Sequence, residues 1–117
     1  MTNEVDDARV FDSADAFERV DNDKELFFEL VDMFFDDYES SLGNIQQAIE
    51  SKESKQLEEY AHSIKSALGN LGAMKSFHHA LFLERAGRSA TFEGVEEVFE
   101  KLKESVVAFQ KEAESFR

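Results

Sequence analysis

Hydrophobic and polar positions alternate along most of this chain with the period of an α-helix. The clearest stripe is close to the C-terminal end and alternates steps of four and three residues throughout. Its members are Val95, Phe99, Leu102, Val106, Phe109, Ala113 and Phe116. Such a stripe is typical of a seam in a left-handed helical bundle. The pattern therefore predicts a helix from about residue 95 to about residue 116.

A longer amphipathic segment runs from about residue 24 to about residue 50. Its inner stripe is predicted to be Leu26, Leu30, Phe34, Leu42, Ile45 and Ile49, and Phe27, Phe28, Val31 and Phe35 widen the apolar face in the first half. A wide face needs two coverings, so we expect the bundle on one side and a short first helix on the other. That short helix begins with a cap at Asp12 or Ser13, ends near Val20, and has Phe17 as its buried anchor.

Two more helices lie between these segments. The first spans about residues 54–71 with the stripe Leu57, Ala61, Ile64, Leu68 and Leu71, and Gly72 is its predicted stop. The second spans about residues 73–86, with Gly87 and Arg88 ending it and a loop at 89–94. Four long amphipathic helices with short connections predict an all-α protein. We expect an antiparallel up-down four-helix bundle with a short extra N-terminal helix.

The 117 residues suffice for one domain with one core. Residues 1–10 are polar and acidic, and we expect them to form a flexible segment before a single domain at 11–117. Cysteine is absent, which excludes disulfides and thiolate metal sites. The apolar runs are far shorter than the roughly 18 residues of a membrane span, and no signal peptide is visible. We therefore expect a cytoplasmic protein that has no membrane partner.

Acidic residues outnumber basic ones by 26 to 13, which gives a formal net charge of −13. Nucleic acids and anionic membranes are therefore poor partners. The acidity serves solubility or steers the chain toward a basic partner. The pairs Asp36-Asp37 and Glu96-Glu97 are expected on solvated faces.

The polar side of the helix at 54–71 carries the candidate chemistry. At about 100° per residue, His62 lies roughly 140° from the middle of the apolar stripe. Lys65, Ser66, Gly69 and Ala73 share its side at spacings of three, four, seven and eleven residues. Because glycine inside a helix costs about 1 kcal/mol relative to alanine, Gly69 needs a reason. We expect that reason to be the close approach of another body to His62.

This arrangement suits phosphoryl chemistry. A neutral imidazole is a competent nucleophile near neutral pH, and Lys65, one turn on, can neutralise an anion held at the ring. The opposite ring nitrogen should then carry its proton and donate it to an acceptor, which selects the tautomer.

The segment Ala61-His62-Ser63-Ile64-Lys65-Ser66, followed by Gly72-Ala73 and then Leu83-Glu84, resembles the histidine-containing phosphotransfer (HPt) domain of two-component phosphorelays. The family pattern is roughly A-H-x-L-K-G, with G-A about ten residues and L-E about twenty-one residues after the histidine. The region of Phe11, Asp23, Leu26 and Phe34 is also similar to the usual opening of that domain. The likeness covers nearly the whole chain. Ser66 stands where the family usually has glycine; serine is also small, so the departure bears on how tightly a partner docks there.

The resemblance implies that His62 accepts the phosphoryl group, that Lys65 supports its charge, and that Glu84 on the neighbouring helix orients the imidazole. Ser66, Gly69 and Ala73 are the expected partner-binding residues. The implied partners are receiver domains of response regulators and of a hybrid sensor histidine kinase. The chain itself is expected to be a monomeric phosphocarrier without a cofactor, because magnesium belongs to the receiver.

Three other interpretations compete with this one. Glu59-x-x-His62 matches one element of a di-metal carboxylate bundle, but Lys75 and Ser76 precede His78 and His79 where a second element would need glutamate. We therefore expect no metal site, and we place His78 and His79 at the surface or its boundary.

In the dimeric bundle of a sensor kinase, an acidic residue commonly follows the histidine, whereas Ser63 follows here. With no room for an ATP-binding domain, no autokinase activity is expected. The remaining alternative is an acidic helical adaptor that is never phosphorylated.

Overall fold

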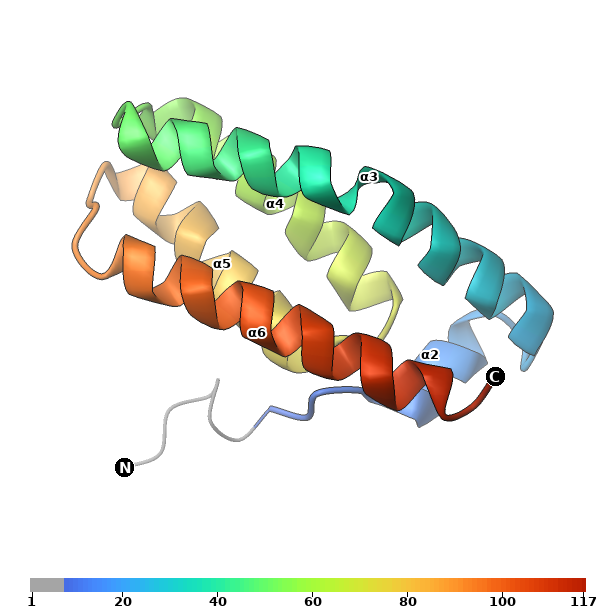
Figure 1. Cartoon of the computed structure of the whole chain (residues 1–117). Coiled ribbons are helices and arrows are strands. Elements are labelled where there is room, and N and C mark those ends of the chain that lie inside the picture. The colour runs from blue at the N-terminus through green and yellow to red at the C-terminus, as the bar shows by residue number, and fades with distance from the viewer. Residues whose placement is uncertain (1–7) are drawn as a thin grey trace.

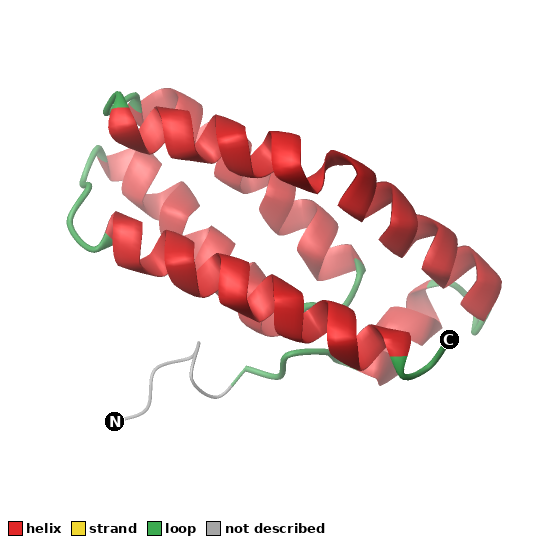
Figure 2. Cartoon of the chain, viewed as in Figure 1, coloured by secondary structure: helices red, strands yellow, loops and turns green. Residues whose placement is uncertain are grey.

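The computed structural model describes residues 8–117, so seven of the ten residues predicted to be flexible lie outside the described part. The described part contains five helices and no strand (Figures 1 and 2). They are α2 (Ser13–Arg19), α3 (Lys24–Glu50), α4 (Ser54–Asn70), α5 (Met74–Ser89) and α6 (Val95–Glu114).

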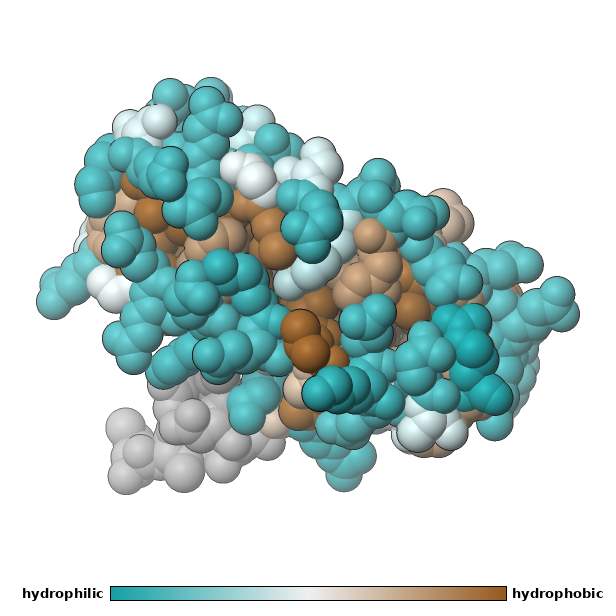
Figure 3. All heavy atoms as spheres, in the orientation of Figure 1, coloured by the Kyte–Doolittle hydropathy of each residue, from teal (hydrophilic) through white to brown (hydrophobic). Residues whose placement is uncertain are grey.

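The four long helices form an antiparallel bundle, and this confirms the predicted fold (Figure 1). Short turns reverse the chain after α3, α4 and α5, so that each helix packs against the next. The closest pair is α4 and α5, while α2 packs on α3 at one end. Figure 3 shows that this face of the molecule is mostly hydrophilic, with hydrophobic atoms visible in a band between α3 and α6. Among residues 8–117, no helix is both long and apolar enough to cross a membrane.

Side-chain caps start the first two described helices where the sequence predicted. Oδ1 of Asp12 accepts a hydrogen bond of 3.1 Å from the backbone N–H of Asp15, and Oδ1 of Asp23 accepts one of 3.0 Å from that of Leu26. Each carboxylate satisfies a backbone donor that has no partner within the helix. Phe17 is buried, as predicted for the anchor of α2.

The predicted stripe of α6 is correct except at its last position. Val95 through Ala113 of that stripe are buried, whereas Phe116 is exposed because the helix ends at Glu114. The Phe116 ring packs edge-on against Phe11 and Phe17 instead of entering the bundle seam. Rings from the N-terminal segment, α2, α3 and α6 thus meet at one end of the molecule.

The predicted stripe of α3 is wrong in its first half, because Leu26 and Leu30 are exposed. The buried positions on this helix are Phe27, Phe28, Val31, Tyr38, Ile45, Ala48 and Ile49. The buried face in the first half of α3 is therefore shifted by one residue from the predicted stripe. It also includes Tyr38, which the predicted stripe lacks. Burial, together with the charge of Glu39, raises the pKa of Tyr38 to about 12.

Gly87 was predicted to end the helix over residues 73–86, but that helix, α5, continues to Ser89. Ala90 ends it in a left-handed conformation with φ of 55°. A Cβ atom at Gly87 would lie 2.5 Å from the backbone nitrogen of Glu58 and 2.7 Å from the carbonyl oxygen of Ser54. The glycine therefore lets the backbones of α4 and α5 touch.

The turn between α4 and α5 is held by residues that precede α2. The backbone N–H of Asp12 donates to the carbonyl oxygen of Gly72 at 2.8 Å, and that of Lys75 donates to the carbonyl oxygen of Arg9 at 2.8 Å. Gly72 has φ of 75°, and a Cβ there would lie 2.7 Å from the Asp12 carbonyl oxygen. Glycine is needed at this predicted stop both for its conformation and for space.

Candidate functional site

His62 stands on the outer side of α4, and 60% of its side chain is exposed. Its Nδ1 atom lies 2.7 Å from Oε2 of Glu84, which comes from the middle of α5. The close approach of α4 and α5 at Gly87 explains why the Glu84 side chain reaches His62. Because the helices are antiparallel, moving back one turn from Gly87 reaches Glu84, while moving forward one turn from Glu58 reaches His62.

Glu84 is a buried carboxylate, with only 5% of its side chain exposed. Nζ of Lys65 donates a hydrogen bond of 2.6 Å to its Oε1. Burial tends to raise the pKa of Glu84, but the hydrogen bonds from Lys65 and His62, with their charges, outweigh it and leave the pKa below its usual value. Glu84 is therefore ionised at neutral pH, and Lys65 compensates its charge.

The ionised state of Glu84 decides the tautomer of His62. An ionised carboxylate can only accept hydrogen bonds, so the Nδ1 atom facing it must carry the proton. In the neutral ring, the lone pair is then on Nε2, the nitrogen that does not contact Glu84. The site thus presents a nucleophilic nitrogen on a largely exposed ring.

Arg88 and Glu58 belong to the same cluster and were missed in the sequence. Nε of Arg88 donates a 2.8 Å hydrogen bond to Oε2 of Glu58, and Nη2 lies 3.5 Å from Oε2 of Glu84. Both could have been found from helical spacing. Glu58 is four residues before His62 and Arg88 is four residues after Glu84, so each lies one turn from a site residue on the same face.

A shallow pocket of about 440 Å³ surrounds these groups. It is lined by Glu58, Glu59, His62, Ser63, Glu84 and Arg88. The pocket therefore combines the imidazole with one guanidinium and several carboxylates. Within residues 8–117, no three His, Cys, Asp or Glu side chains are placed to hold a metal ion together.

The three predicted partner-binding residues have different surroundings. Ser66 is exposed, and its hydroxyl donates to the carbonyl oxygen of His62 at 3.1 Å. Gly69 is half-buried, because the ring of Phe77 lies 3.1 Å from where its Cβ would be. The Phe77 ring thus covers part of Gly69, and the role of Gly69 in partner binding stays a prediction.

Ala73 is not a surface residue, and its predicted role in partner binding is wrong. It is fully buried and precedes the first residue of α5 as its N-cap. Helical spacing from His62 does not apply at Ala73, because α4 has already ended before Gly72. His79 is likewise buried rather than at the surface or its boundary, and His78 is half-buried.

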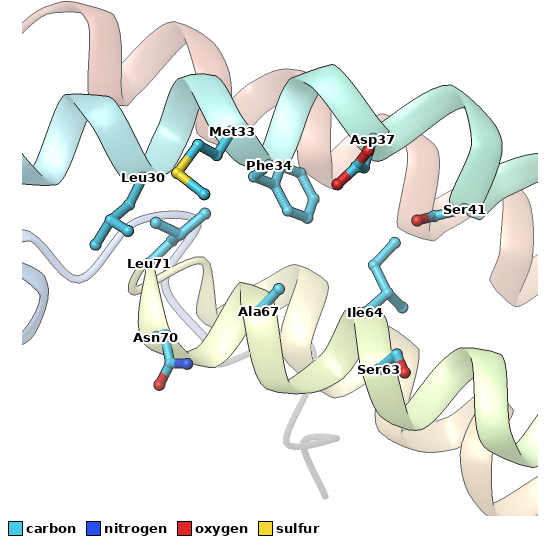
Figure 4. Close-up of a pocket in the computed structure, with 10 residues that line it drawn as sticks. All are labelled: Leu30, Met33, Phe34, Asp37, Ser41, Ser63, Ile64, Ala67, Asn70 and Leu71. Atoms are coloured by element: carbon cyan, nitrogen blue, oxygen red, sulfur yellow. The ribbon is translucent and has the colours of Figure 1, made fainter.

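A second hollow of about 360 Å³ lies between α3 and α4 (Figure 4). Leu30, Met33 and Phe34 of α3 point toward α4 across it (Figure 4). The α4 residues that line it are Ser63, Ile64, Ala67, Asn70 and Leu71. Ser63 lines both this groove and the pocket around His62, so the two hollows adjoin on α4.

Comparison with known families decides the identity of this bundle. The Hpt domain family matches residues 29–112, which include α4, α5 and all of the His62 cluster. The chain belongs to the Hpt domain family. It is a histidine phosphotransfer protein of the phosphorelay type, as the resemblance of its motifs implied. The match gives no support to the adaptor alternative.

A solved structure shares the fold of this Hpt domain. It is the crystal structure of the histidine-containing phosphotransfer protein B (HptB) from Pseudomonas aeruginosa PAO1. The TM-score is 0.80 with 21% sequence identity, and the similarity covers 94% of this chain and 99% of the other. No curated protein matches this Hpt domain. Hpt proteins are phosphocarriers that interact with receiver domains of two-component systems.

Proposed function

We propose that His62 carries the phosphoryl group and that it receives this group from the aspartyl phosphate of a receiver domain. Nε2 attacks phosphorus with its lone pair, an N–P bond forms, and the P–O bond to the aspartate breaks. The electron pair of the broken bond remains with the aspartate carboxylate. Nδ1 keeps its proton throughout, and the ring becomes a cation that the Glu84 carboxylate stabilises.

The same steps in reverse pass the group to the aspartate of a second receiver. The proposed partners are receivers of response regulators and of a hybrid sensor histidine kinase. Magnesium and most of the catalytic groups would belong to those receivers, while this chain supplies a positioned nucleophile. We further propose that the chain acts as a monomer in the cytoplasm, without contact with nucleic acid or membranes.

The observation that carries this proposal is the 2.7 Å contact between His62 Nδ1 and the buried Glu84 carboxylate. It directs the proton to one nitrogen and leaves the other as a nucleophile. It also places a negative charge where the ring becomes positive during transfer, so the same carboxylate serves both the ground state and the product.

The test is transfer of labelled phosphate from a receiver domain loaded with acetyl phosphate. We expect acid-labile, base-stable label on the wild-type chain and none on His62→Gln. His78→Gln is the matched control, because it removes an imidazole from α5 and should leave labelling intact. Wild-type labelling of a folded His62→Gln variant would refute the assignment.

We also propose that the chain has no autokinase activity, because the sequence lacks a glycine-rich loop that could cradle nucleotide phosphates. Incubation with magnesium and ATP alone should leave the chain unlabelled. Label that appears on His62 without a receiver or a kinase would contradict this proposal.

The groove between α3 and α4 extends the proposed receiver contact. It adjoins the His62 pocket at Ser63, so a receiver seated over His62 would lie beside the groove. The exposed side chains of Leu30 and Met33 supply apolar area there. A partner surface of matching chemistry combines an apolar contact with basic residues, since this chain is strongly acidic.

A further inference from the structure

Two cationic side chains lie beside Glu84, and they are held very differently. Lys65 is nearly covered, with 18% of its side chain exposed, and its ammonium bonds Oε1 of Glu84 at 2.6 Å. Arg88 is 64% exposed and touches Oε2 of the same carboxylate only at 3.5 Å. Lys65 is therefore held in place by Glu84, whereas Arg88 is free to move.

Lys65 cannot leave Glu84 without a large penalty. Its withdrawal would remove the nearest cation from an ionised carboxylate that is almost completely buried, and breaking a buried ion pair is strongly destabilising. The carboxylate would then also hold the His62 ring less firmly, because its pKa would rise. Lys65 therefore serves Glu84 in both the free and the phosphorylated chain.

Arg88 can leave its partners at little cost. Its main partner, Glu58, is itself partly exposed, and ion pairs of this kind contribute little to stability. The guanidinium already lines the pocket that contains His62. Its planar set of donors also matches phosphate oxygens in a two-point geometry that an ammonium lacks.

We propose that Arg88 leaves Glu58 and binds the phosphoryl group on His62, while Lys65 stays on Glu84 as a positioning residue. This inference rests on the proposed phosphorylation of His62. It reassigns the role that the family resemblance implied for Lys65. Glu58 then acts as a competitor for the guanidinium, so the Glu58–Arg88 pair sets how long the phosphohistidine survives.

The first test is the lifetime of phosphohistidine on Arg88→Gln, measured as loss of label after the receiver is removed. We expect a lifetime about fivefold shorter than that of the wild type, as for the loss of one ordinary hydrogen bond. Arg85→Gln is the matched control, because Arg85 is exposed on the same helix and does not line the pocket. Its lifetime should equal that of the wild type.

Phosphorus NMR separates contact from an indirect effect. The phosphohistidine signal should shift in Arg88→Gln and stay in place in Arg85→Gln. Lys65→Gln should instead change the nitrogen signals of the unphosphorylated His62 ring, which report the tautomer. An unchanged lifetime and phosphorus signal in Arg88→Gln would overturn the proposal, even if His62 is labelled normally.

Glu58→Gln tests the competition from the other side. Removing the competitor should lengthen the phosphohistidine lifetime about twofold to threefold. Glu59→Gln is the control, since it removes a neighbouring charge from the same pocket and has no ion pair with Arg88 among the described contacts. Equal effects of the two variants would reduce Glu58 to one nearby charge and overturn its role as competitor. Failure of His62 labelling itself would instead remove the proposed function.

Discussion

The two sides of α4 differ in how closely they pack against the neighbouring helices. Toward α5, the backbones touch at Gly87, and a buried carboxylate joins His62 and Lys65 across the contact. Toward α3, the helices leave a groove of about 360 Å³ beside exposed leucine and methionine side chains. One side holds the imidazole in a defined position, while the other retains apolar surface that a partner can cover. A single helix thus carries the positioned imidazole on one side and an apolar surface for a partner on the other.

The largest effect should come from closing the space at Gly87. Gly87→Ala places a methyl group against the backbone of α4, and we expect a loss of about 3 kcal/mol of unfolding free energy. The forced separation should also break the His62–Glu84 hydrogen bond, which nitrogen NMR of the ring detects.

Gly43→Ala is the control for this change. Gly43 lies in α3, and nothing lies within 4 Å of where its Cβ would be. This variant should gain up to about 1 kcal/mol from helix propensity alone. Equal stabilities of the two variants would mean that the α4–α5 contact is looser than described.

A second test uses pH on the α5 side of the comparison. Since the folded-state pKa of Glu84 is lowered, its ionised form stabilises the fold above the usual value of 4.5, and that stability is lost as pH falls through the folded-state pKa. Glu84→Gln should remove this contribution, about 1.5–3 kcal/mol for hydrogen bonds to a charged group. Denaturant unfolding of both proteins at pH 7 and pH 3 measures it. A stability difference that does not shrink at low pH would contradict the ionised state.

The groove side is tested by binding rather than by stability. Met33→Glu places a charge in the groove, and we expect about tenfold weaker affinity for a receiver domain with little change in stability. Val107→Glu is the control, because Val107 is also an exposed hydrophobic residue but belongs to α6. Titration calorimetry with the same receiver distinguishes the two. Equal losses would indicate general charge repulsion instead of contact at the groove.

The smallest effect is expected at Gly69. Alanine gains about 1 kcal/mol of helix propensity there, but the ring of Phe77 must move by a few tenths of an ångström. The end of a side chain can yield, unlike the backbone that faces Gly87, so the net change should stay within about 0.5 kcal/mol. Thermal unfolding checks this. A loss comparable with that of Gly87→Ala would show that Phe77 is held as rigidly as a backbone.

Periodicity in the sequence predicted the helices because each amphipathic stripe reports on its own helix. The bounds of α3 at Lys24 and Glu50 match the prediction, since Asp23 is a cap and residues 51–53 are polar. The stripe of α3 failed where the apolar face is wider than one neighbour can cover. Leu26 and Phe27 are both apolar, and only the position of the neighbouring helices decides which is buried.

Contacts between helices could not be predicted from the hydrophobic stripe of one helix. Gly87 looks like a helix end when α5 is considered alone, and its role is visible only beside the backbone of Glu58. Ala73 has the spacing of a surface residue only while the helix is assumed to continue past Gly72. The pairing of His62 with Glu84 is not a product of periodicity, because it was implied by the family resemblance. The structure adds Arg88 and Glu58, each one helical turn from those two.

The backbone bonds from Arg9 and Asp12 to the α4–α5 turn have a practical consequence for anyone who trims this protein. A version that starts at Ser13 keeps every helix that the structure describes. It loses, however, the two hydrogen bonds that tie down the corner where the histidine-bearing helix turns into its carboxylate-bearing neighbour. Shortened versions meant for kinetic work should therefore begin ahead of Arg9.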